Sequence, residues 1–352
     1  MTKTIKIGIV VGNGTGRELS EIFKKVILLV KPISQKIEFI ECKHLFNTYA
    51  SVKNLRGDEI KEIIKKELNI LKSFYKDFYK KGGRVIFRTA INAETLYLLR
   101  KWGKCIKLFT IPFDNCKILF CRDQMQGFYA NDDYLIKKNK IQFYGSFSKT
   151  DLREVINFSI QEAEKTFGED FEILVVYKHH LFSNTIENWI KDILPEWRLS
   201  KVKIYQPNHM VKFLFELDRR KKKNILIIVG NEIGDICHEL FLYQFTDEKR
   251  ETSFSKNIYL KKEIRGLIEY QTVHGSADDI ADKDIVNPIA TLKIAGKIGE
   301  DVLKIKNFYI LMEKVIKNHY DKIQKNMYSF KTSEFVEQVI KDISEMIGEE
   351  GK

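Results

Sequence analysis

Hydrophobic and polar residues alternate along this chain with two periods, which predict strands and helices that follow one another. Residues 5–11 are a run of Ile and Val interrupted by few polar residues, which predicts a buried strand. The next apolar positions recur at helical spacing, at Leu19, Ile22, Phe23, Val26 and Val30. A strand followed by an amphipathic helix is thus the first unit of the fold.

The same two periods continue along the rest of the chain. They predict strands over residues 37–42, 84–88, 106–111, 117–122, 141–144, 173–178, 202–205 and 224–229. Helices are predicted over residues 58–79, 95–102, 152–167, 185–193, 209–217 and 233–243, and then near 288–305, 308–324 and 333–347. Such alternation predicts an α/β protein with sheets flanked by helices.

Length and composition indicate an ordinary soluble protein. A chain of 352 residues suggests two domains, and 44% hydrophobic with 31% charged residues allows a sizeable core. No apolar run approaches the roughly 18 residues that cross a bilayer, and the N-terminus has no signal-peptide layout. We therefore expect a cytoplasmic protein with no membrane partner.

The cysteines and the net charge add little chemistry. Five widely spaced cysteines without a Cys-x-x-Cys pair favour reduced thiols that pack in the core. The pairs His179-His180 and Cys237-His238 could suggest a transition metal, but isolated pairs are more often packing or surface residues. The net charge of +12 fits an anionic ligand, nucleic acid or a lysine-rich coding bias. The basic run 219–223 has no interleaved aromatic residues, so it predicts a solvated loop and no nucleic-acid partner.

Three segments carry a resemblance. The turn 12–18 reads Gly-Asn-Gly-Thr-Gly-Arg-Glu, which by spacing alone is a weak signal for a dinucleotide fold. Residues 122–129 read Arg-Asp-Gln-Met-Gln-Gly-Phe-Tyr. Residues 273–281 read Val-His-Gly-Ser-Ala-Asp-Asp-Ile-Ala, and 287–291 read Asn-Pro-Ile-Ala-Thr. In order and spacing these resemble the isopropylmalate, isocitrate and tartrate dehydrogenases, a family of metal-dependent decarboxylating enzymes.

The resemblance implies a site for NAD. A nicotinamide cofactor needs backbone donors for its phosphates and a carboxylate for its ribose hydroxyls. The family supplies these from one loop, and the matching residues are His274, Gly275, Ser276, Ala277, Asp279 and Asn287. Asp279 would repel a 2′-phosphate, which favours NAD over NADP. A glycine turn that caps a helix beginning at Pro288 is the structural alternative.

The family's chemistry is oxidation of a substituted malate followed by loss of a carboxylate. Arg100 and Arg122 match two arginines that hold the substrate's carboxylates, and a surface role is the alternative for Arg100. A third family arginine falls on Thr110. Tyr129 and Lys178 match the acid and base, with Lys178 ending the predicted strand and reaching the partner subunit's site.

The resemblance also implies Mg²⁺ or Mn²⁺. Asp235 and Glu239, four residues apart on one helix face, match two carboxylate ligands. The third, from the neighbouring subunit, falls on Gln206, whose neutral amide weakens the metal site. Gln271 likewise replaces a glutamate before the cofactor loop.

These observations lead to one expectation with an alternative. We expect the isocitrate/isopropylmalate dehydrogenase-like two-domain fold, with residues 1–99 and 250–352 binding cofactor and 100–249 carrying a homodimer contact. The expected activity is NAD- and metal-dependent oxidation of a malate-like 2-hydroxy acid, a small-molecule carboxylate. The alternative is a non-catalytic regulatory or nucleotide-binding subunit, with a paralogous partner chain. The residues around Thr95 identify no single substrate side chain.

Overall fold

The computed structural model describes residues 3–113, 116–127, 134–137, 139–216, 223–246, 252–273, 275–325 and 331–350. Tyr129, His274 and most of the basic run 219–223 lie outside these residues. The chain forms two compact units. Unit 1 consists of Met1–Leu96, Arg250–Lys256 and Gly266–Lys352, and unit 2 of Tyr97–Lys249 and Asn257–Arg265. The assignment of cofactor binding to one part and a dimer contact to the other stays a prediction.

Unit 1 contains four strands that lie in the order β2-β1-β3-β12, with parallel pairing throughout. They are β1 (Lys3–Val10), β2 (Gln35–Glu41), β3 (Val85–Arg88) and β12 (Leu267–Thr272). Its helices are α1 (Gly16–Val30), α2 (Tyr49–Val52), α3 (Gly57–Lys80), α10 (Ile289–Asp301), α11 (Phe308–Lys325) and α12 (Thr332–Glu350), with the short 3-10 turn η6 (Asp278–Ile280).

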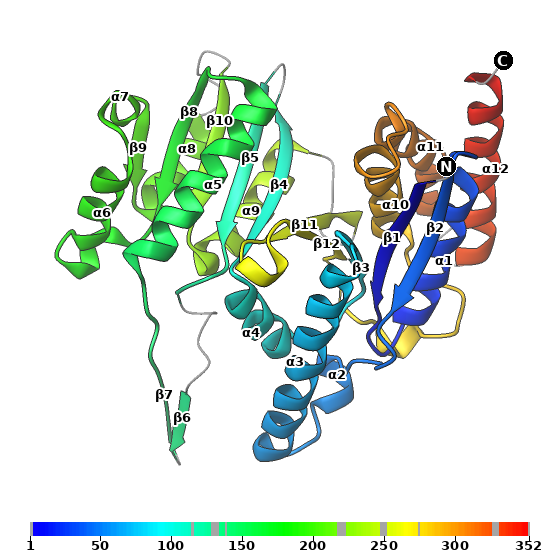
Figure 1. Ribbon diagram of the computed structural model, residues 1–352, viewed down its shortest axis with the longest axis horizontal. Coiled ribbons are helices and arrows are strands. Elements are labelled where there is room, and N and C mark those ends of the chain that lie inside the picture. Colours follow the sequence, from blue (N-terminus) through cyan, green and yellow to red (C-terminus); the bar gives the residue numbers. More distant parts are fainter. Residues whose placement is uncertain are drawn as a thin grey trace. The chain divides into compact units, whose positions relative to one another are not determined.

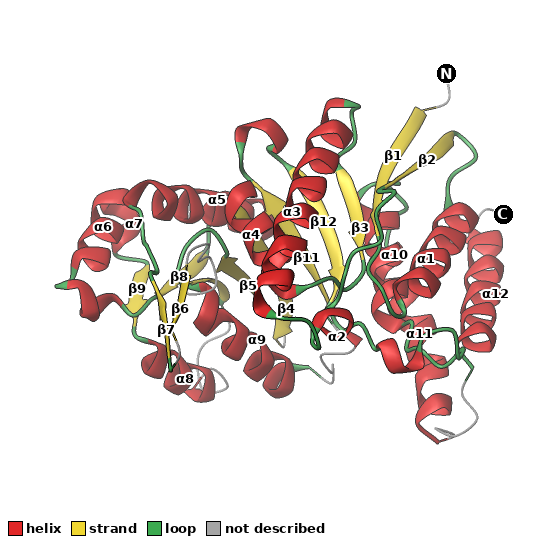
Figure 2. Cartoon of the chain, turned by 90° about the horizontal axis from the view of Figure 1, so that it is seen from below, coloured by secondary structure: helices red, strands yellow, loops and turns green. Residues whose placement is uncertain are grey.

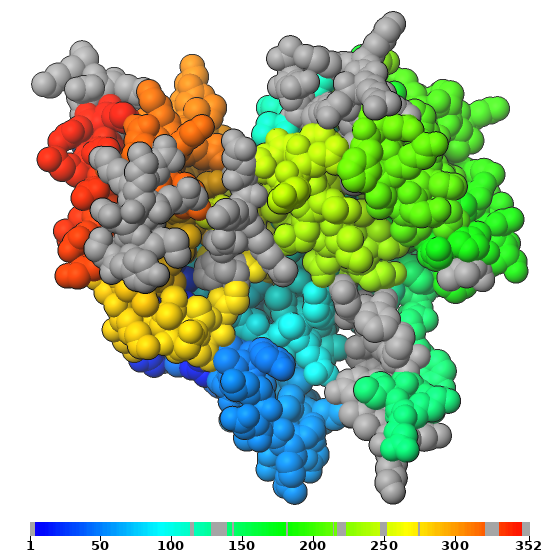
Figure 3. Space-filling view, turned by 180° about the vertical axis from the view of Figure 1, so that it is seen from behind, coloured from blue at the N-terminus to red at the C-terminus, as the bar shows by residue number. Residues whose placement is uncertain are grey.

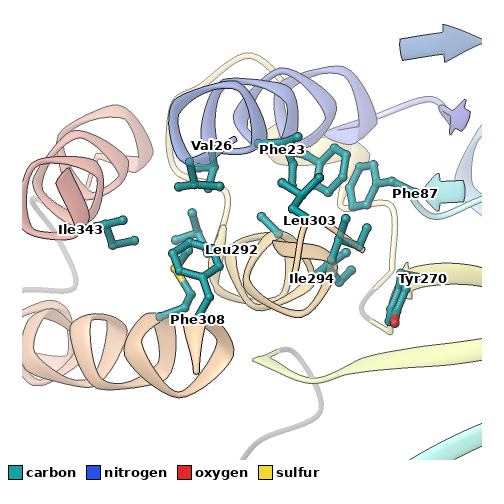
Figure 4. Packing of buried hydrophobic residues seen from close by; sticks show 14 of the residues in the cluster. Phe23, Val26, Phe87, Tyr270, Leu292, Ile294, Leu303, Phe308 and Ile343 are labelled. Carbon is teal, nitrogen blue, oxygen red and sulfur yellow. The ribbon is translucent and has the colours of Figure 1, made fainter. Parts of the chain in front are cut away.

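The core of unit 1 lies on one face of this sheet, where α1, α10, α11 and α12 pack (Figure 4). Phe23 of α1 stacks on Phe87 of β3, with ring centroids 4.2 Å apart. Phe78 of α3 packs on the other face, beside Gly8 and Gly83. Strands buried on both faces are typical of parallel sheets, which explains why the last four residues of β1 and most of β3 are apolar.

Unit 2 has the strand order β4-β5-β10-β8-β9, in which only the β4–β5 pair is antiparallel. These strands are β4 (Cys105–Phe113), β5 (Cys116–Asp123), β8 (Phe171–Val176), β9 (Val202–Tyr205) and β10 (Asn224–Val229). A separate antiparallel pair consists of β6 (Tyr134–Lys137) and β7 (Lys140–Phe143) (Figure 1).

Helices cover both faces of the unit 2 sheet. They are α5 (Lys149–Phe167), α6 (Thr185–Ile193), α7 (Glu196–Leu199), α8 (Pro207–Glu216) and α9 (Asn231–Phe245), with the 3-10 turns η2 (His179–Phe182) and η5 (Lys262–Ile264). Figure 2 shows α8 and α9 on one side of these strands and α5 on the other. The side chains of α8 and α9 pack with those of β4, β5, β8 and β10 in one apolar cluster. This cluster positions α9, which carries the acidic residues singled out in the sequence.

Two elements belong to both units: α4 (Ala93–Gly103) and β11 (Phe254–Tyr259). β11 lies between β12 and β4 in the hydrogen-bonded order of the ten-stranded sheet. Most predicted elements are confirmed to within a few residues, but β11 and β12 were not predicted. Among the described residues no helix has the length and apolar character needed to cross a membrane.

Candidate active site

Arg122 is the centre of the candidate residues in unit 2. It lies near the carboxyl end of β5, and its side chain is almost completely buried. Its Nε donates to Asn231 Oδ1 at 2.7 Å, and its Nη1 donates to the carboxylate of Asp235. Gly234 makes room for this arrangement, because a Cβ there would lie 2.8 Å from the Arg122 stem. The first turn of α9 therefore holds the guanidinium in place.

Asp235 and Glu239 lie on successive turns of α9, as the sequence predicts. The Asp235 side chain is 40% exposed, so its carboxylate is accessible although it accepts from Arg122. Two hard oxygen donors fit Mg²⁺ or Mn²⁺ but do not complete a site. Within the part of the chain that the structure describes, no group of three His, Cys, Asp or Glu side chains could hold a metal ion.

Gln206 immediately precedes α8, and its backbone carbonyl accepts the first hydrogen bond of that helix, from Met210. The side-chain oxygen of Gln206 is buried and has no hydrogen-bond partner among the described residues. An amide oxygen can coordinate a hard cation, but it brings no charge. Position 206 therefore lacks the negative charge that a carboxylate would contribute as a third metal ligand.

The two other predicted substrate contacts differ in burial. Arg100, in the last turn of α4, is buried, and its guanidinium lies 5.5 Å from the centre of the Tyr97 ring. The alternative of a surface role for Arg100 is therefore wrong. Thr110 is exposed on β4 opposite Leu119 of β5. Lys107, which the sequence did not single out, is buried on the same strand.

Lys178 does not end a strand. β8 ends at Val176, and Lys178 is the residue that precedes the 3-10 turn η2. Its side chain is exposed. The ladder of β8 with β10 stops at the pair Val176 and Val229, the last residue of each strand. Tyr129, the other half of the predicted acid/base pair, lies outside the described residues.

Asp123, a buried acid next to Arg122, was not predicted as a site residue from the sequence. Asp123 accepts hydrogen bonds from the backbone of Met125 and from the side chains of Gln126 and Tyr177. Burial nevertheless raises the pKa of Asp123 to about 6. Burial and the neighbouring Asp123 raise the pKa of Tyr177 well above its ordinary value.

Cysteine and histidine on α9 are packing residues. Cys237 is buried, and burial raises the pKa of its thiol to about 11. The ring of His238 stacks on Phe109 with centroids 3.6 Å apart. All five cysteines are free thiols, and four are buried. The packing role predicted for Cys237 and His238 is confirmed.

In unit 1 the glycine turn fits against the predicted cofactor loop. Gly14 has a φ of +73°, and a Cβ there would lie 2.3 Å from Asp278 Oδ1. The backbone nitrogen and hydroxyl of Thr15 both donate to the carbonyl of Ser276, at 3.1 and 3.0 Å. Asp278 also accepts from the hydroxyl of Thr48 at 3.0 Å. The turn therefore receives the chain's own carboxylate, which explains glycine there without a bound phosphate.

The cofactor loop itself has features that fit a dinucleotide. Ala277 adopts the left-handed conformation just before η6, and Asp279 is exposed. A Cβ added to Gly275 would meet nothing within 4 Å, so the fold does not require glycine there. Asn287 Oδ1 accepts from the backbone of Ile289 at 3.0 Å, which caps α10 and leaves the amide group for a ligand. His274 lies outside the described residues.

Gln271 belongs to a buried polar network. The guanidinium of Arg88 donates to Gln271 Oε1, to Glu269 Oε1 at 3.1 Å and to its neighbour's carbonyl. The hydroxyl of Tyr75 donates to the other oxygen of Glu269. Glu269 and Arg88 are both almost fully buried, so the ion pair depends on these additional partners.

Comparison with known proteins matches this chain to the family described as isocitrate/isopropylmalate dehydrogenase over residues 6–339. Subunit 2 of the mitochondrial NAD isocitrate dehydrogenase of Saccharomyces cerevisiae is 23% identical over 330 residues, covering 92% of this chain and 82% of that protein. The 3-isopropylmalate dehydrogenase of Carboxydothermus hydrogenoformans is 24% identical over 177 residues, covering 49% and 43%.

Solved structures share the fold. The isocitrate dehydrogenase of Methylococcus capsulatus superimposes with a TM-score of 0.65 at 14% identity, covering 97% of this chain and 99% of that chain. The TT0538 protein of Thermus thermophilus superimposes with a TM-score of 0.65 at 16% identity, covering 96% and 67%. The resemblance carried by the three segments, and the α/β fold expected from it, are confirmed. This chain belongs to the isocitrate/isopropylmalate dehydrogenase family, whose members are NAD(P)-dependent decarboxylating oxidoreductases that act on CH–OH groups.

Proposed function

We propose that this chain is an NAD- and divalent-metal-dependent dehydrogenase that oxidises a malate-like 2-hydroxy acid, with loss of carbon dioxide. The observation that carries the proposal is the contact of Arg122 with Asp235. It joins a buried guanidinium, which suits a carboxylate ligand, to an accessible acid on the helix that also bears Glu239. Arg122 also has a buried Nη2 without a hydrogen-bond partner among the described residues, and such a donor suits an oxygen of an anionic ligand.

Four of the candidate site residues contact the substrate or transfer a proton in this proposal. Arg100 and Arg122 hold substrate carboxylates, because buried guanidinium groups form strong charge-assisted hydrogen bonds. Lys178 takes the proton of the substrate hydroxyl, and its exposure suits a residue that serves the partner subunit's site. Tyr129 returns a proton to the carbon that loses carbon dioxide.

Asp235 and Glu239 would hold Mg²⁺ or Mn²⁺, with the amide oxygen of Gln206 as a weaker, neutral donor from the neighbouring subunit. When bound, such a cation polarises the substrate hydroxyl and lowers the energy of negative charge that develops after decarboxylation. Asp235 is also held by Arg122, so the acid is oriented before any cation binds.

The loop 275–287 would bind NAD. The open space beside Gly275 lets a pyrophosphate approach the backbone, and the exposed carboxylate of Asp279 suits the ribose hydroxyls. The free amide of Asn287 suits the adenine ring. These features favour NAD over NADP, because Asp279 repels a 2′-phosphate.

A homodimer contact through α8 and α9 completes the proposal. These helices carry four exposed apolar side chains: Val211, Phe215, Ile236 and Tyr243. Figure 3 shows this part of the chain, in yellow-green, at the surface of unit 2. Exposed apolar residues that recur at helical spacing are expected where a second copy packs. Gln206 lies directly before α8, so the same contact would bring it to the partner.

One observation favours a second candidate, a non-catalytic regulatory or nucleotide-binding subunit. Gln206 lacks the charge of a third metal ligand, and the relative from Saccharomyces cerevisiae is named as one subunit of an NAD isocitrate dehydrogenase. The two candidates differ in turnover. The purified chain is mixed with NAD, Mn²⁺ and a panel of substituted malates, and NADH is followed by absorbance. Formation of NADH with any member supports the dehydrogenase, whereas NAD binding without NADH favours the non-catalytic subunit.

A further inference from the structure

The carboxylate of Asp278 ties the predicted cofactor loop to two other segments of unit 1. Its Oδ2 accepts a 3.0 Å hydrogen bond from the hydroxyl of Thr48, and its Oδ1 lies against Gly14. We propose that this contact is a latch that fixes the loop and directs the next residue, Asp279, to the surface. Asp278 and Thr48 then set the preference for NAD over NADP without touching the cofactor. The inference rests on the proposed function for the role of Asp279 at the ribose.

The loop is held at two points that lie two residues apart. The carbonyl of Ser276 accepts from both the backbone nitrogen and the hydroxyl of Thr15, at 3.1 and 3.0 Å. Asp278 Oδ1 and the Ser276 carbonyl oxygen would lie 2.3 and 2.6 Å from a Cβ at Gly14, so both enter the space that a side chain would fill. Between the two points Ala277 adopts the left-handed conformation. The contacts therefore fix the backbone that leads into η6.

Thr48 is a firm anchor for the latch because its neighbours are fixed by other bonds. The backbone carbonyl of Phe46 accepts from Asn13 at 2.8 Å. The backbone and side-chain nitrogens of Asn47 both donate to Glu67 Oε1 of α3, at 2.8 and 2.9 Å. Thr48 itself is 1% exposed. Its hydroxyl is therefore held in the position from which it reaches the loop.

The turn η6 transfers the position of Asp278 to Asp279. It covers Asp278–Ile280 and is closed by a 3.1 Å hydrogen bond from the backbone of Ile280 to that of Ala277. Successive side chains of a 3-10 turn point about 120° apart, so an inward side chain at 278 leaves the next one outward. Asp279 is indeed exposed. A released loop would let this carboxylate turn away from the ribose and would weaken its repulsion of a 2′-phosphate.

The charge of Asp278 can be separated from its hydrogen bond. Its Oδ1 is buried and has no hydrogen-bond partner among the described residues, so the bond from Thr48 is the contact to preserve. An asparagine keeps an oxygen that accepts from Thr48 but has no charge. Asp278→Asn therefore keeps the latch, whereas Asp278→Ala removes both the charge and the latch.

Calorimetric titration of the full chain with NAD and with NADP gives the ratio of the two affinities. We expect Asp278→Ala and Thr48→Val each to lower the preference for NAD by about 10-fold. Asp278→Asn and Thr48→Ser keep the hydrogen bond and should retain the wild-type ratio within about twofold. Asp282→Ala is the matched control, because Asp282 is an exposed acid of the same loop, and it should also retain the ratio.

Hydrogen exchange measures the latch without any cofactor. The amides of residues 275–281 should exchange faster in Asp278→Ala and Thr48→Val than in wild type, and at the wild-type rate in Asp278→Asn. The double variant should resemble either single variant, because both remove the same contact. Amides of α10 are the internal reference, and their unchanged exchange distinguishes release of the loop from unfolding of unit 1.

The outcomes separate this inference from the proposed function. A preference for NAD that falls equally in Asp278→Asn and Asp278→Ala would show that the charge acts directly on the cofactor, which overturns the latch. An unchanged preference in Asp278→Ala and Thr48→Val overturns the latch and keeps the proposed cofactor site. A chain that prefers NAD through the latch but forms no NADH keeps the inference and overturns the dehydrogenase. A wild type that binds neither cofactor, or does not prefer NAD, overturns both.

Discussion

The hydroxyl of Tyr177 donates a 3.0 Å hydrogen bond to Asp123 Oδ2 inside unit 2, and both side chains are buried. The acid has two further donors, Met125 N and Gln126 Nε2. Burial nevertheless outweighs these bonds and raises the pKa of Asp123 to about 6, because water no longer solvates the carboxylate. Asp123 therefore changes charge within a pH range in which an ordinary aspartate stays ionised.

This shift predicts a pH dependence of folding stability. Between pH 4 and pH 6 the native chain holds a proton on Asp123 that the unfolded chain has released. The free energy of unfolding therefore falls as pH rises through this window, on the order of 3 kcal/mol for this group. Denaturant titrations of wild type and Asp123→Asn at several pH values measure it. The stability difference between them should change from pH 4 to 6 and stay constant above; a constant difference throughout would contradict the burial argument.

Gly12 and Gly275 of unit 1 have different surroundings, so a methyl group added at each position should have a different effect. A Cβ at Gly12 would lie 1.8 Å from the carbonyl oxygen of Ala90, so Gly12→Ala should destabilise the fold on the order of 3 kcal/mol. Gly275→Ala meets nothing and should leave the melting temperature unchanged, but should weaken NAD binding about 10-fold or more. Thermal melts and calorimetry separate the two. Unchanged NAD affinity in Gly275→Ala would mean that no phosphate approaches this loop.

The exposed carboxylate of Asp279 predicts a preference for NAD over NADP. Calorimetric titration with both cofactors measures the ratio of affinities. Asp279→Asn removes the charge and should narrow this ratio, whereas the equivalent change at the exposed Asp282 serves as a control. Equal affinity for both cofactors in the wild type would rule out Asp279 as the ribose-reading residue.

The neutral amide at position 206 predicts weak metal binding. Gln206→Asp should raise Mn²⁺ affinity by about 1–3 kcal/mol if the new carboxylate coordinates directly. The exposed Asn208 lies two residues away, so Asn208→Asp adds the same charge as a control. Mn²⁺ titration of both variants tests this. The same dissociation constant in both would place residue 206 away from the metal.

Tyr129 predicts a loss of turnover without a loss of binding. If its phenol is the general acid, Tyr129→Phe should lower turnover by roughly 10²- to 10⁴-fold and keep NAD and Mn²⁺ affinities. Tyr144→Phe, at an exposed tyrosine, is the control. Steady-state rates with the best substituted malate provide the measurement. Full activity in Tyr129→Phe would assign proton donation to another group.

The sequence predicted the elements whose apolar residues recur with a clear period. β10 was predicted with the observed bounds, because five of its six residues are buried and apolar. β11 and β12 were missed because buried polar residues interrupt their pattern, namely Ser255 and Asn257 in β11 and Glu269 in β12. Glu269 is satisfied by an ion pair with Arg88 and a hydrogen bond from Tyr75, and both partners are distant in sequence.

The arrangement of the candidate site residues was also predictable only where it follows from local sequence. The helical spacing of Asp235 and Glu239 follows from local sequence, so their common face was predictable. The cross-strand partners of Thr110 and Lys107, by contrast, depend on the register of β4 with β5, which no local pattern determines. The contact between the Asp278 carboxylate and Gly14 likewise involves residues more than 260 positions apart. Long-range pairing, rather than local propensity, decided each of these cases.

The guanidinium of Arg88 donates to both Glu269 and Gln271. The replacement of a glutamate by Gln271 therefore has to be considered together with Arg88 and Glu269. A glutamate restored at 271 would add a second buried carboxylate beside Glu269, and one guanidinium would have to neutralise both. The effect of Gln271→Glu therefore depends on the residue at 269. In evolutionary terms, positions 88, 269 and 271 are epistatic, and relatives that carry glutamate at 271 should differ at the other two as well.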